Sequence, residues 1–108
     1  MPMRVIITTE AEGDLLSHTD WIAKDSPVNA IAVARELRAK IATLRQYPRS
    51  GRPAVERRFA QHELRQISLR PYRIVYAIFN ETVWVLHVRH SSQQFLRRSE
   101  LRIGSMVE

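Results

Sequence analysis

Arginine and histidine side chains in the second half of the chain have the types and spacing that could act on a charged group. Arg65 and Arg73 lie eight residues apart, and His90 comes shortly after the apolar run VWVLHV. An arginine can bind a phosphate or a carboxylate through two parallel hydrogen bonds, and histidine gains or loses a proton near neutral pH. These three residues could therefore bind an anionic group and move a proton.

The position of Arg73 is unusual because it lies inside the apolar stretch LRPYRIVYAIF, residues 69–79. The stretch is short for a helix and rich in β-branched and aromatic residues, which predicts a strand that ends near Asn80. Alternation along a strand places Arg73 on the face that carries Val75, Ala77 and Phe79. Both faces are apolar beyond the first pair of residues, which indicates an inner strand with Arg73 near one end.

Two interpretations of Arg73 follow from this position. The aliphatic stem can pack against the apolar face while the guanidinium projects outward to an anionic partner, and this is the interpretation that we expect. The alternative is an ion pair with a carboxylate such as Glu63, which would tie the sheet edge to the preceding loop.

Length and charge indicate a single domain, residues 1–108, with an anionic partner. The net charge of the 108 residues is +6. Residues 1–34 hold two basic and five acidic side chains, whereas residues 35–108 hold fifteen basic and six acidic ones, a net charge of +9. Almost all of this excess is arginine, so the expected partner is nucleic acid, an acidic protein segment, or each in turn. A basic surface without a specific partner is the alternative.

Several classes of site are excluded or disfavoured by composition. The chain has no cysteine, which rules out disulfides and thiolate metal sites. The four histidines lack a metal-ligand spacing and no Gly-rich phosphate loop occurs, so we expect no metal and no cofactor. No apolar run approaches a membrane span and the N-terminus lacks the features of a signal peptide. We expect a cytoplasmic protein without membrane contact.

The first third of the chain predicts a strand followed by a helical hairpin. Residues 3–8 alternate as a strand does, and Thr9 with Glu12 three residues later forms a capping box that opens a helix to about Lys24. The inward face of this helix is predicted to carry Ala11, Leu15, His18 and Ile22. We expect Trp21 and Trp84 each to anchor the core or an interface.

A second helix begins where Ser26 can cap and Pro27 occupies the first helical position, and it ends at Tyr47 and Pro48. Its apolar face is predicted to carry Ile31, Ala34, Leu37, Ile41 and Leu44. Residues 47–62 contain two prolines, a glycine and four arginines without a sustained period, which predicts a connecting loop.

Three consecutive strands complete the predicted order. They span Glu63 to Arg70, Tyr72 to Asn80, and Thr82 to His90. Asn80 and Glu81 form a tight hairpin, so these strands are antiparallel neighbours. The tail from Ser91 forms a short terminal helix or remains loose. The fold class is α+β, in the order β-α-α-β-β-β, with the helical hairpin on one sheet face; the other face need not be covered, and its arginine-rimmed surface is the expected working surface.

Four motifs carry a resemblance to a known family. They are LRQYPRSGRP at the exit of the second helix, ELR and YRIVY in two strands, and VLHVRH in the last strand. Together with AEGDLLSHTDWIA in the first helix, these pieces span about residues 5–92 and resemble the ParE/RelE superfamily, the toxin halves of bacterial toxin–antitoxin pairs.

The resemblance implies one of two activities. RelE-like members are ribosome-dependent endonucleases that cut messenger RNA, whereas ParE-like members poison DNA gyrase and are not known to need a hydrolytic centre. The loop sequence YPRSGRP followed by ELR is ParE-like. RelE-like nucleases often have a lysine pair on the second strand, and in that region this chain has Leu64, Arg65 and Gln66. A ParE-like toxin without catalytic residues is therefore expected. A RelE-like nuclease is the alternative, and a basic nucleic-acid-binding module comes last because no recognition helix is evident.

In the nuclease alternative, the family's YR motif assigns the phosphate contact to Arg73, with Arg65 assisting and His90 moving the proton. RelE-like sites usually add a lysine, tyrosine or arginine after the last strand, where this chain has serine and glutamine at residues 91–94. His90 could instead bond a nearby carbonyl. We expect His87 to pack or lie at the surface, and His18 to be hydrogen-bonded on the buried side of its helix.

The resemblance also implies a cognate antitoxin whose C-terminal segment wraps the toxin. The charge of residues 35–108 predicts that this segment is acidic as well as apolar. The expected partner-binding residues are Arg57, Arg58, Arg65, Arg70, Arg73, Arg97 and Arg98.

Overall fold

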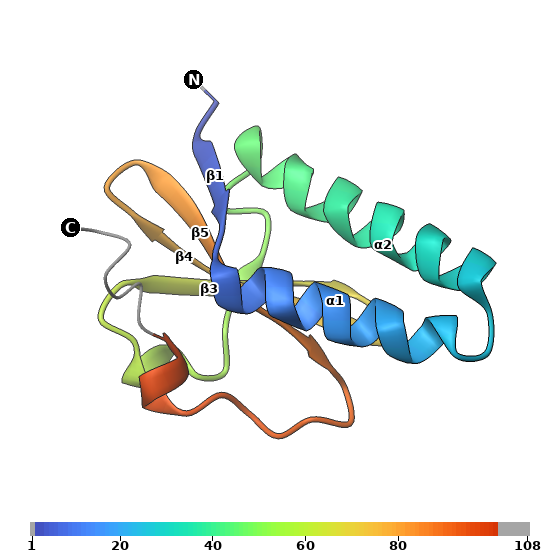
Figure 1. Ribbon diagram of the computed structural model, residues 1–108. Helices are drawn as coiled ribbons and strands as arrows, with labels where there is room; N and C mark the ends of the chain where they lie inside the picture. The colour runs from blue at the N-terminus through green and yellow to red at the C-terminus, as the bar shows by residue number, and fades with distance from the viewer. Residues whose placement is uncertain (1, 102–108) are drawn as a thin grey trace.

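The computed structural model describes residues 2–101 and confirms the predicted order of elements (Figure 1). The helices and main strands are β1 (Arg4–Ile7), α1 (Thr9–Ala23), α2 (Pro27–Ala42), β3 (Glu63–Leu69), β4 (Tyr72–Phe79) and β5 (Thr82–His90). Shorter elements are the 3-10 turns η1 (Thr43–Arg45), η2 (Arg57–Phe59) and η3 (Arg98–Leu101), and the two-residue strand β2 (Arg52–Pro53). Within the described residues, neither α-helix is long and apolar enough to cross a bilayer.

The start of α1 differs by one residue from the prediction. Thr8, and not Thr9, is the N-cap, and its hydroxyl accepts a hydrogen bond from the Ala11 amide at 3.2 Å. The same hydroxyl donates to the Val85 carbonyl at 2.8 Å. Thr8 is therefore the better cap because it also fixes the helix start to β5. The start of α2 is as predicted, with Ser26 as cap and Pro27 in the first turn.

The sheet has five strands in the order β1-β5-β4-β3-β2. The predicted antiparallel meander of β3, β4 and β5 is confirmed, and Asn80 and Glu81 have φ values of 55° and 56°, as a two-residue hairpin of type I′ requires. The N-terminal strand β1 pairs in parallel with β5. Residues 47–62, predicted as a connecting loop, contain β2, which pairs with β3 opposite Arg65 and Gln66.

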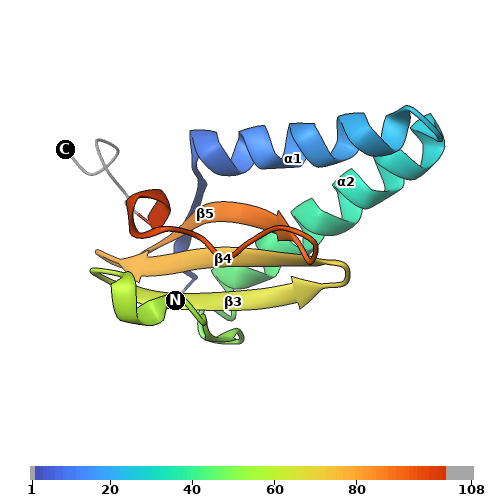
Figure 2. The same cartoon turned by 90° about the horizontal axis from the view of Figure 1, so that it is seen from below.

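Both faces of the sheet are covered, so the expectation of an open face is wrong. The helical hairpin covers one face, where Leu15, Leu37 and Ile41 pack on Ile74 and Tyr76. The opposite face carries a second apolar core, in which the segment after β2 and the tail after β5 cover β3, β4 and β5 (Figure 2). The members of this second core are Ala54, Leu64, Val75, Ala77, Trp84, Leu86, Leu96 and Leu101.

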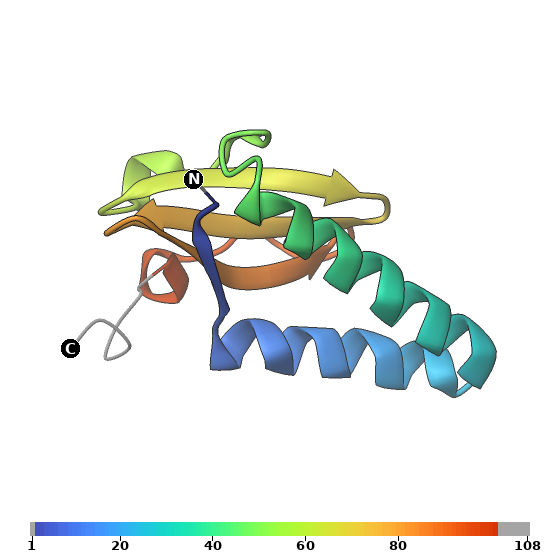
Figure 3. The ribbon, with the colours of Figure 1, turned by 90° about the horizontal axis from the view of Figure 1, so that it is seen from above.

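The turn end of the helical hairpin extends past the ends of the strands (Figure 3). This explains why Ile31, predicted to face inward, is 55% exposed, whereas Leu37, Ile41 and Leu44 farther along α2 are buried. Trp21 is 71% exposed, so it is not a core anchor. Trp84 is buried, as expected, and its indole nitrogen donates to the Phe79 carbonyl.

Gly51 lies where the chain between α2 and β3 crosses the sheet. The Gly51 amide donates to the Tyr76 hydroxyl at 3.1 Å, and that hydroxyl donates to the Pro48 carbonyl at 2.8 Å. Burial raises the pKa of Tyr76, which keeps this hydroxyl protonated. A Cβ at position 51 would lie 2.4 Å from the Gln66 carbonyl oxygen and 2.6 Å from the Tyr76 hydroxyl. Only glycine fits this crossing.

We predict that Gly51→Ala lowers the free energy of unfolding by about 1–3 kcal/mol or more, because the added methyl group meets the β3 backbone. The matched control is Gly13→Ala in α1, where the added Cβ meets no atom within 4 Å apart from its chain neighbours and the backbone of its own helix. That control is expected to raise stability by up to about 1 kcal/mol. Urea melts of both variants test this, and equal effects would contradict the role of Gly51.

Candidate functional site

The guanidinium of Arg73 does not project outward, so that expectation is wrong. It forms a two-pronged ion pair with Glu56, in which Nη1 donates to Oε1 at 3.0 Å and Nη2 donates to Oε2. The Glu56 side chain is 2% exposed and that of Arg73 is 17% exposed. An ion pair was the alternative interpretation, but its carboxylate is Glu56 and not Glu63. The segment after β2 folds back over the second sheet face and delivers Glu56 there.

Glu56 also holds the C-terminal tail. Its Oε2 accepts a hydrogen bond from the Leu96 amide at 2.9 Å, and the ring of Phe95 lies 5.6 Å from the Arg73 guanidinium carbon. Burial alone would raise the pKa of Glu56, but the hydrogen bonds from Arg73 and Leu96 outweigh burial and lower it. Glu56 is therefore a buried carboxylate that joins β4 to two irregular segments.

Glu63 takes part in a different and more exposed cluster. Its carboxylate accepts from Arg65 Nε at 2.6 Å and from Arg49 Nη2 at 3.0 Å, and these contacts lower the pKa of Glu63. Arg65 Nη1 also donates to the Gly51 carbonyl at 2.6 Å. Arg65 is thus held at the chain crossing above Tyr76.

The three catalytic candidates do not meet. Arg65 is opposite Tyr76 and His90 is opposite Tyr72 in the strand register, so both lie on the face that the helices cover. Arg73 alternates with these tyrosines along β4 and lies on the other face. Arg65 and His90 share a face but lie apart on it, because the four residue steps from Tyr72 to Tyr76 span roughly 13 Å along β4. The sheet therefore separates Arg73 from both of the other candidates.

His90 lies in a small cluster at the end of β5. Its Nδ1 is 2.8 Å from the Ser92 hydroxyl and accepts from the Ser92 amide at 3.1 Å. The ring packs edge-on against Tyr72, which also contacts His18. His18 Nε2 lies 2.7 Å from the Val88 carbonyl, which confirms the expected hydrogen-bonded histidine on the inner side of α1.

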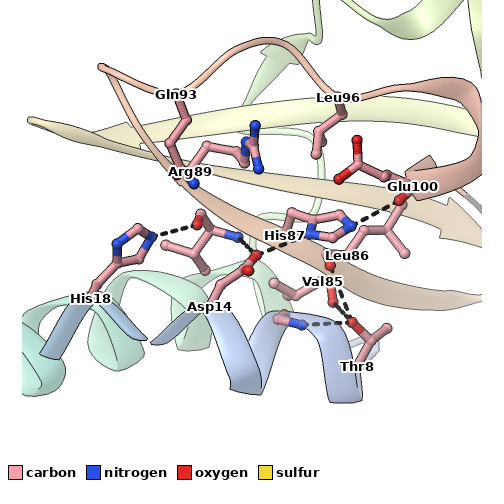
Figure 4. A network of polar contacts seen from close by, with 12 residues as sticks. Thr8, Asp14, His18, Val85, Leu86, His87, Arg89, Gln93, Leu96 and Glu100 are labelled. Atoms are coloured by element: carbon pink, nitrogen blue, oxygen red, sulfur yellow. Dashed lines mark hydrogen bonds and ion pairs between the residues drawn. The ribbon is translucent and has the colours of Figure 1, made fainter. Parts of the chain in front are cut away.

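Sequence reasoning missed a buried polar network around His87 (Figure 4). Asp14 Oδ2 accepts from the Val88 amide at 2.9 Å and lies 2.9 Å from His87 Nδ1, while His87 Nε2 lies 2.9 Å from the Glu100 carbonyl. Both partners of the ring are acceptors, so either ring nitrogen donates to its partner when it carries a hydrogen. The network fastens α1 and η3 to β5, and its members are too far apart in sequence for a local motif to reveal them.

The remaining predicted partner-binding arginines are exposed and fall into two places. Arg58 and Arg98 each place a guanidinium carbon 5.8 Å from the Phe59 ring, which brings η2 and η3 together. Arg57 and Arg97 belong to the same two segments, whereas Arg70 lies at the β3–β4 turn. Of the seven predicted residues, only Arg65 and Arg73 form ion pairs within residues 2–101.

We predict that Arg73→Ala lowers the free energy of unfolding by about 3–5 kcal/mol, because it leaves the Glu56 carboxylate buried without its cation. Arg49→Ala is the matched control, since it removes an arginine from an exposed ion pair with Glu63 and should cost no more than about 1 kcal/mol. Urea melts of the two variants provide the comparison. An Arg73→Ala effect as small as that of the control would show that the pair is not structural.

The lowered pKa of Glu56 predicts a specific loss of stability in acid. A carboxyl whose pKa is lower in the folded state stabilises the fold above its unfolded pKa of about 4.3, and this contribution is lost as the pH falls through the folded pKa. Glu56→Gln lacks the titrating group. The stability difference between wild type and Glu56→Gln should therefore shrink as urea melts are moved from about pH 6 to about pH 3. A constant difference across this range would contradict the prediction.

Comparison with known proteins identifies the family of this fold. Residues 5–95 match the family of the ParE toxin of the type II toxin–antitoxin system parDE. Toxin RelE2 of Caulobacter vibrioides is 30% identical over 91 residues, covering 83% of this chain and 97% of the relative.

Two solved structures have a similar fold. The chromosomal ParDE system from P. aeruginosa aligns with a TM-score of 0.69 at 18% identity, covering 82% of this chain and 95% of that one. The toxin–antitoxin complex RelBE2 from Mycobacterium tuberculosis aligns with a TM-score of 0.51 at 28% identity, covering 83% and 99%. The chain therefore belongs to the ParE/RelE superfamily and is a type II toxin of that superfamily.

Proposed function

We propose that this protein is a ParE-like toxin that arrests growth by binding DNA gyrase. The observation that carries the proposal is the separation of Arg73 from Arg65 and His90 by the sheet. Cleavage of RNA through its 2′-hydroxyl needs a base, a cation and an acid around one phosphate. The geometry supports a toxin that acts by binding. Because gyrase is a cytoplasmic enzyme, a toxin that binds gyrase would act in the cytoplasm.

The proposal includes a cognate antitoxin. The similar solved structures are a ParDE system and a RelBE2 toxin–antitoxin complex, and the net charge of +9 in residues 35–108 is suited to an acidic partner segment. Binding of such a segment to the folded toxin alone would stabilise the toxin by mass action.

A RelE-like messenger RNA nuclease is the second candidate. The observation in its favour is the name of the 30% identical relative, Toxin RelE2. In this alternative Arg73 would have to leave Glu56 to reach a phosphate, and the tail held by Glu56 through Leu96 would have to move with it. The nuclease thus requires a rearrangement that a gyrase-binding toxin does not.

We predict that the purified toxin inhibits supercoiling by gyrase or traps cleaved DNA, and that it leaves messenger RNA on translating ribosomes intact. Addition of the antitoxin in excess should restore supercoiling, which controls for nonspecific inhibition by a basic protein. Agarose-gel assays of plasmid topology and primer extension on the messenger RNA provide the two measurements. Cut messenger RNA with unaffected gyrase would reject the proposal in favour of the nuclease.

A further inference from the structure

A pocket of about 420 Å³ lies beside the β3–β4 turn on the second sheet face. It is lined by Arg52, Gln66, Ser68, Arg70, Pro71, Tyr72, Arg73 and Ser91. Three of these residues are arginines and none is acidic. The pocket lies next to the Glu56–Arg73 pair, whose charges neutralise each other.

Two arginines of the pocket are available to a ligand. Arg52 and Arg70 are exposed, and neither forms an ion pair within residues 2–101. They come from different elements, since Arg52 lies in β2 opposite Gln66 and Arg70 follows β3. A single anionic group between them could therefore be bound from two sides.

Gln66 adds a side-chain amide donor to the pocket. The side chain is 4% exposed, and its oxygen accepts from Arg73 Nη1 at 3.2 Å. An arginine can only donate, so the amide oxygen must face Arg73 and the amide nitrogen must face away from it. This nitrogen has no acceptor among the described residues. The nitrogen is not among the fully enclosed atoms without a partner, so it stays accessible from the pocket that Gln66 lines, where a ligand oxygen can accept its hydrogen bond.

From these three observations we infer that the pocket binds a carboxylate side chain from the acidic segment of the antitoxin. The inference rests on the proposed function in one respect, the existence of that partner. Pro71 and Tyr72 supply an apolar wall beside the donors, which suits a peptide side chain. A nucleic-acid strand would instead need an exposed aromatic face within the pocket on which a base could stack, and the one aromatic residue among its lining residues, Tyr72, is buried beneath His18 and His90.

The test compares two double variants that remove the same charge. Arg52→Ala/Arg70→Ala changes the pocket, whereas Arg4→Ala/Arg45→Ala changes a hollow that β1 forms at the far edge of the sheet. Calorimetric titration of each intact toxin variant with the full-length cognate antitoxin gives the affinity of that variant. We expect the pocket variant to bind at least about 30-fold more weakly and the control to stay within about threefold of wild type. Thermal melts check that both variants are folded.

A second arm identifies the carboxylate. Each aspartate and glutamate of the antitoxin's C-terminal segment is replaced by asparagine or glutamine and titrated against wild-type and pocket-variant toxin. One carboxylate should weaken binding to the wild type and have little further effect on the variant, which is the signature of a direct interaction in a double-mutant cycle. Carboxylates that act additively with the pocket variant at every position would overturn the inference.

Three other results would also overturn it. Equal weakening by the pocket and control variants would show only general charge attraction. Unchanged antitoxin affinity with lost gyrase inhibition would assign the pocket to the target, and unchanged affinity with lost messenger RNA cleavage would assign it to a phosphate. Failure of the proposed function is distinguishable, because a wild-type toxin without effect on gyrase can still show arginine-dependent binding of the antitoxin.

Discussion

The buried carboxylate of Glu56 is the constraint on which the second half of the structure depends. It binds Arg73 through both oxygens and also accepts from the Leu96 amide, so one side chain fixes β4, the segment after β2 and the tail. Arg73 and Arg89 are direct neighbours across β4 and β5, and two cations so placed would repel. A buried ion pair adds little stability compared with apolar packing, but its loss is costly. The pair therefore acts mainly to specify how these segments cover the sheet.

This arrangement determines which arginines can meet a partner. Arg65 and Arg73 satisfy carboxylates of the same chain, whereas Arg52 and Arg70 border a pocket without an acidic lining residue. Composition shows the excess of arginine but not this division. Arg52 was not among the predicted partner-binding residues, because a cation in a Pro- and Gly-rich loop has no sequence pattern that distinguishes it from its neighbours.

Elements with local signals were predictable from the sequence. Ser26 with Pro27 marks the start of α2, and Asn80 with Glu81 marks the hairpin, because in each case neighbouring residues determine the backbone geometry. The Thr8 cap was misplaced because its advantage is a bond to Val85, 77 residues away. The parallel pairing of β1 with β5 and the covered second face likewise depend on contacts between distant segments, for which a single sequence carries no pattern.

The grouping of Arg65, Arg73 and His90 into one catalytic site fails at the step from strand to sheet. Period-two alternation correctly placed Arg73 with Val75 and Ala77, on a face that proved to be an apolar core. The antiparallel β3–β4 register places Arg65 beside Tyr76 on the opposite face, and a β-bulge in the β4–β5 pairing at Val75 and Tyr76 brings His90 beside Tyr72 on that face as well. The unbroken β3–β4 register could have excluded Arg65 from a site shared with Arg73, but the bulge that moves His90 to the other face has no signal in the short β4–β5 turn. Grouping the three residues by chemical type alone ignored the sheet between them, and a catalytic constellation requires side chains that converge on one face.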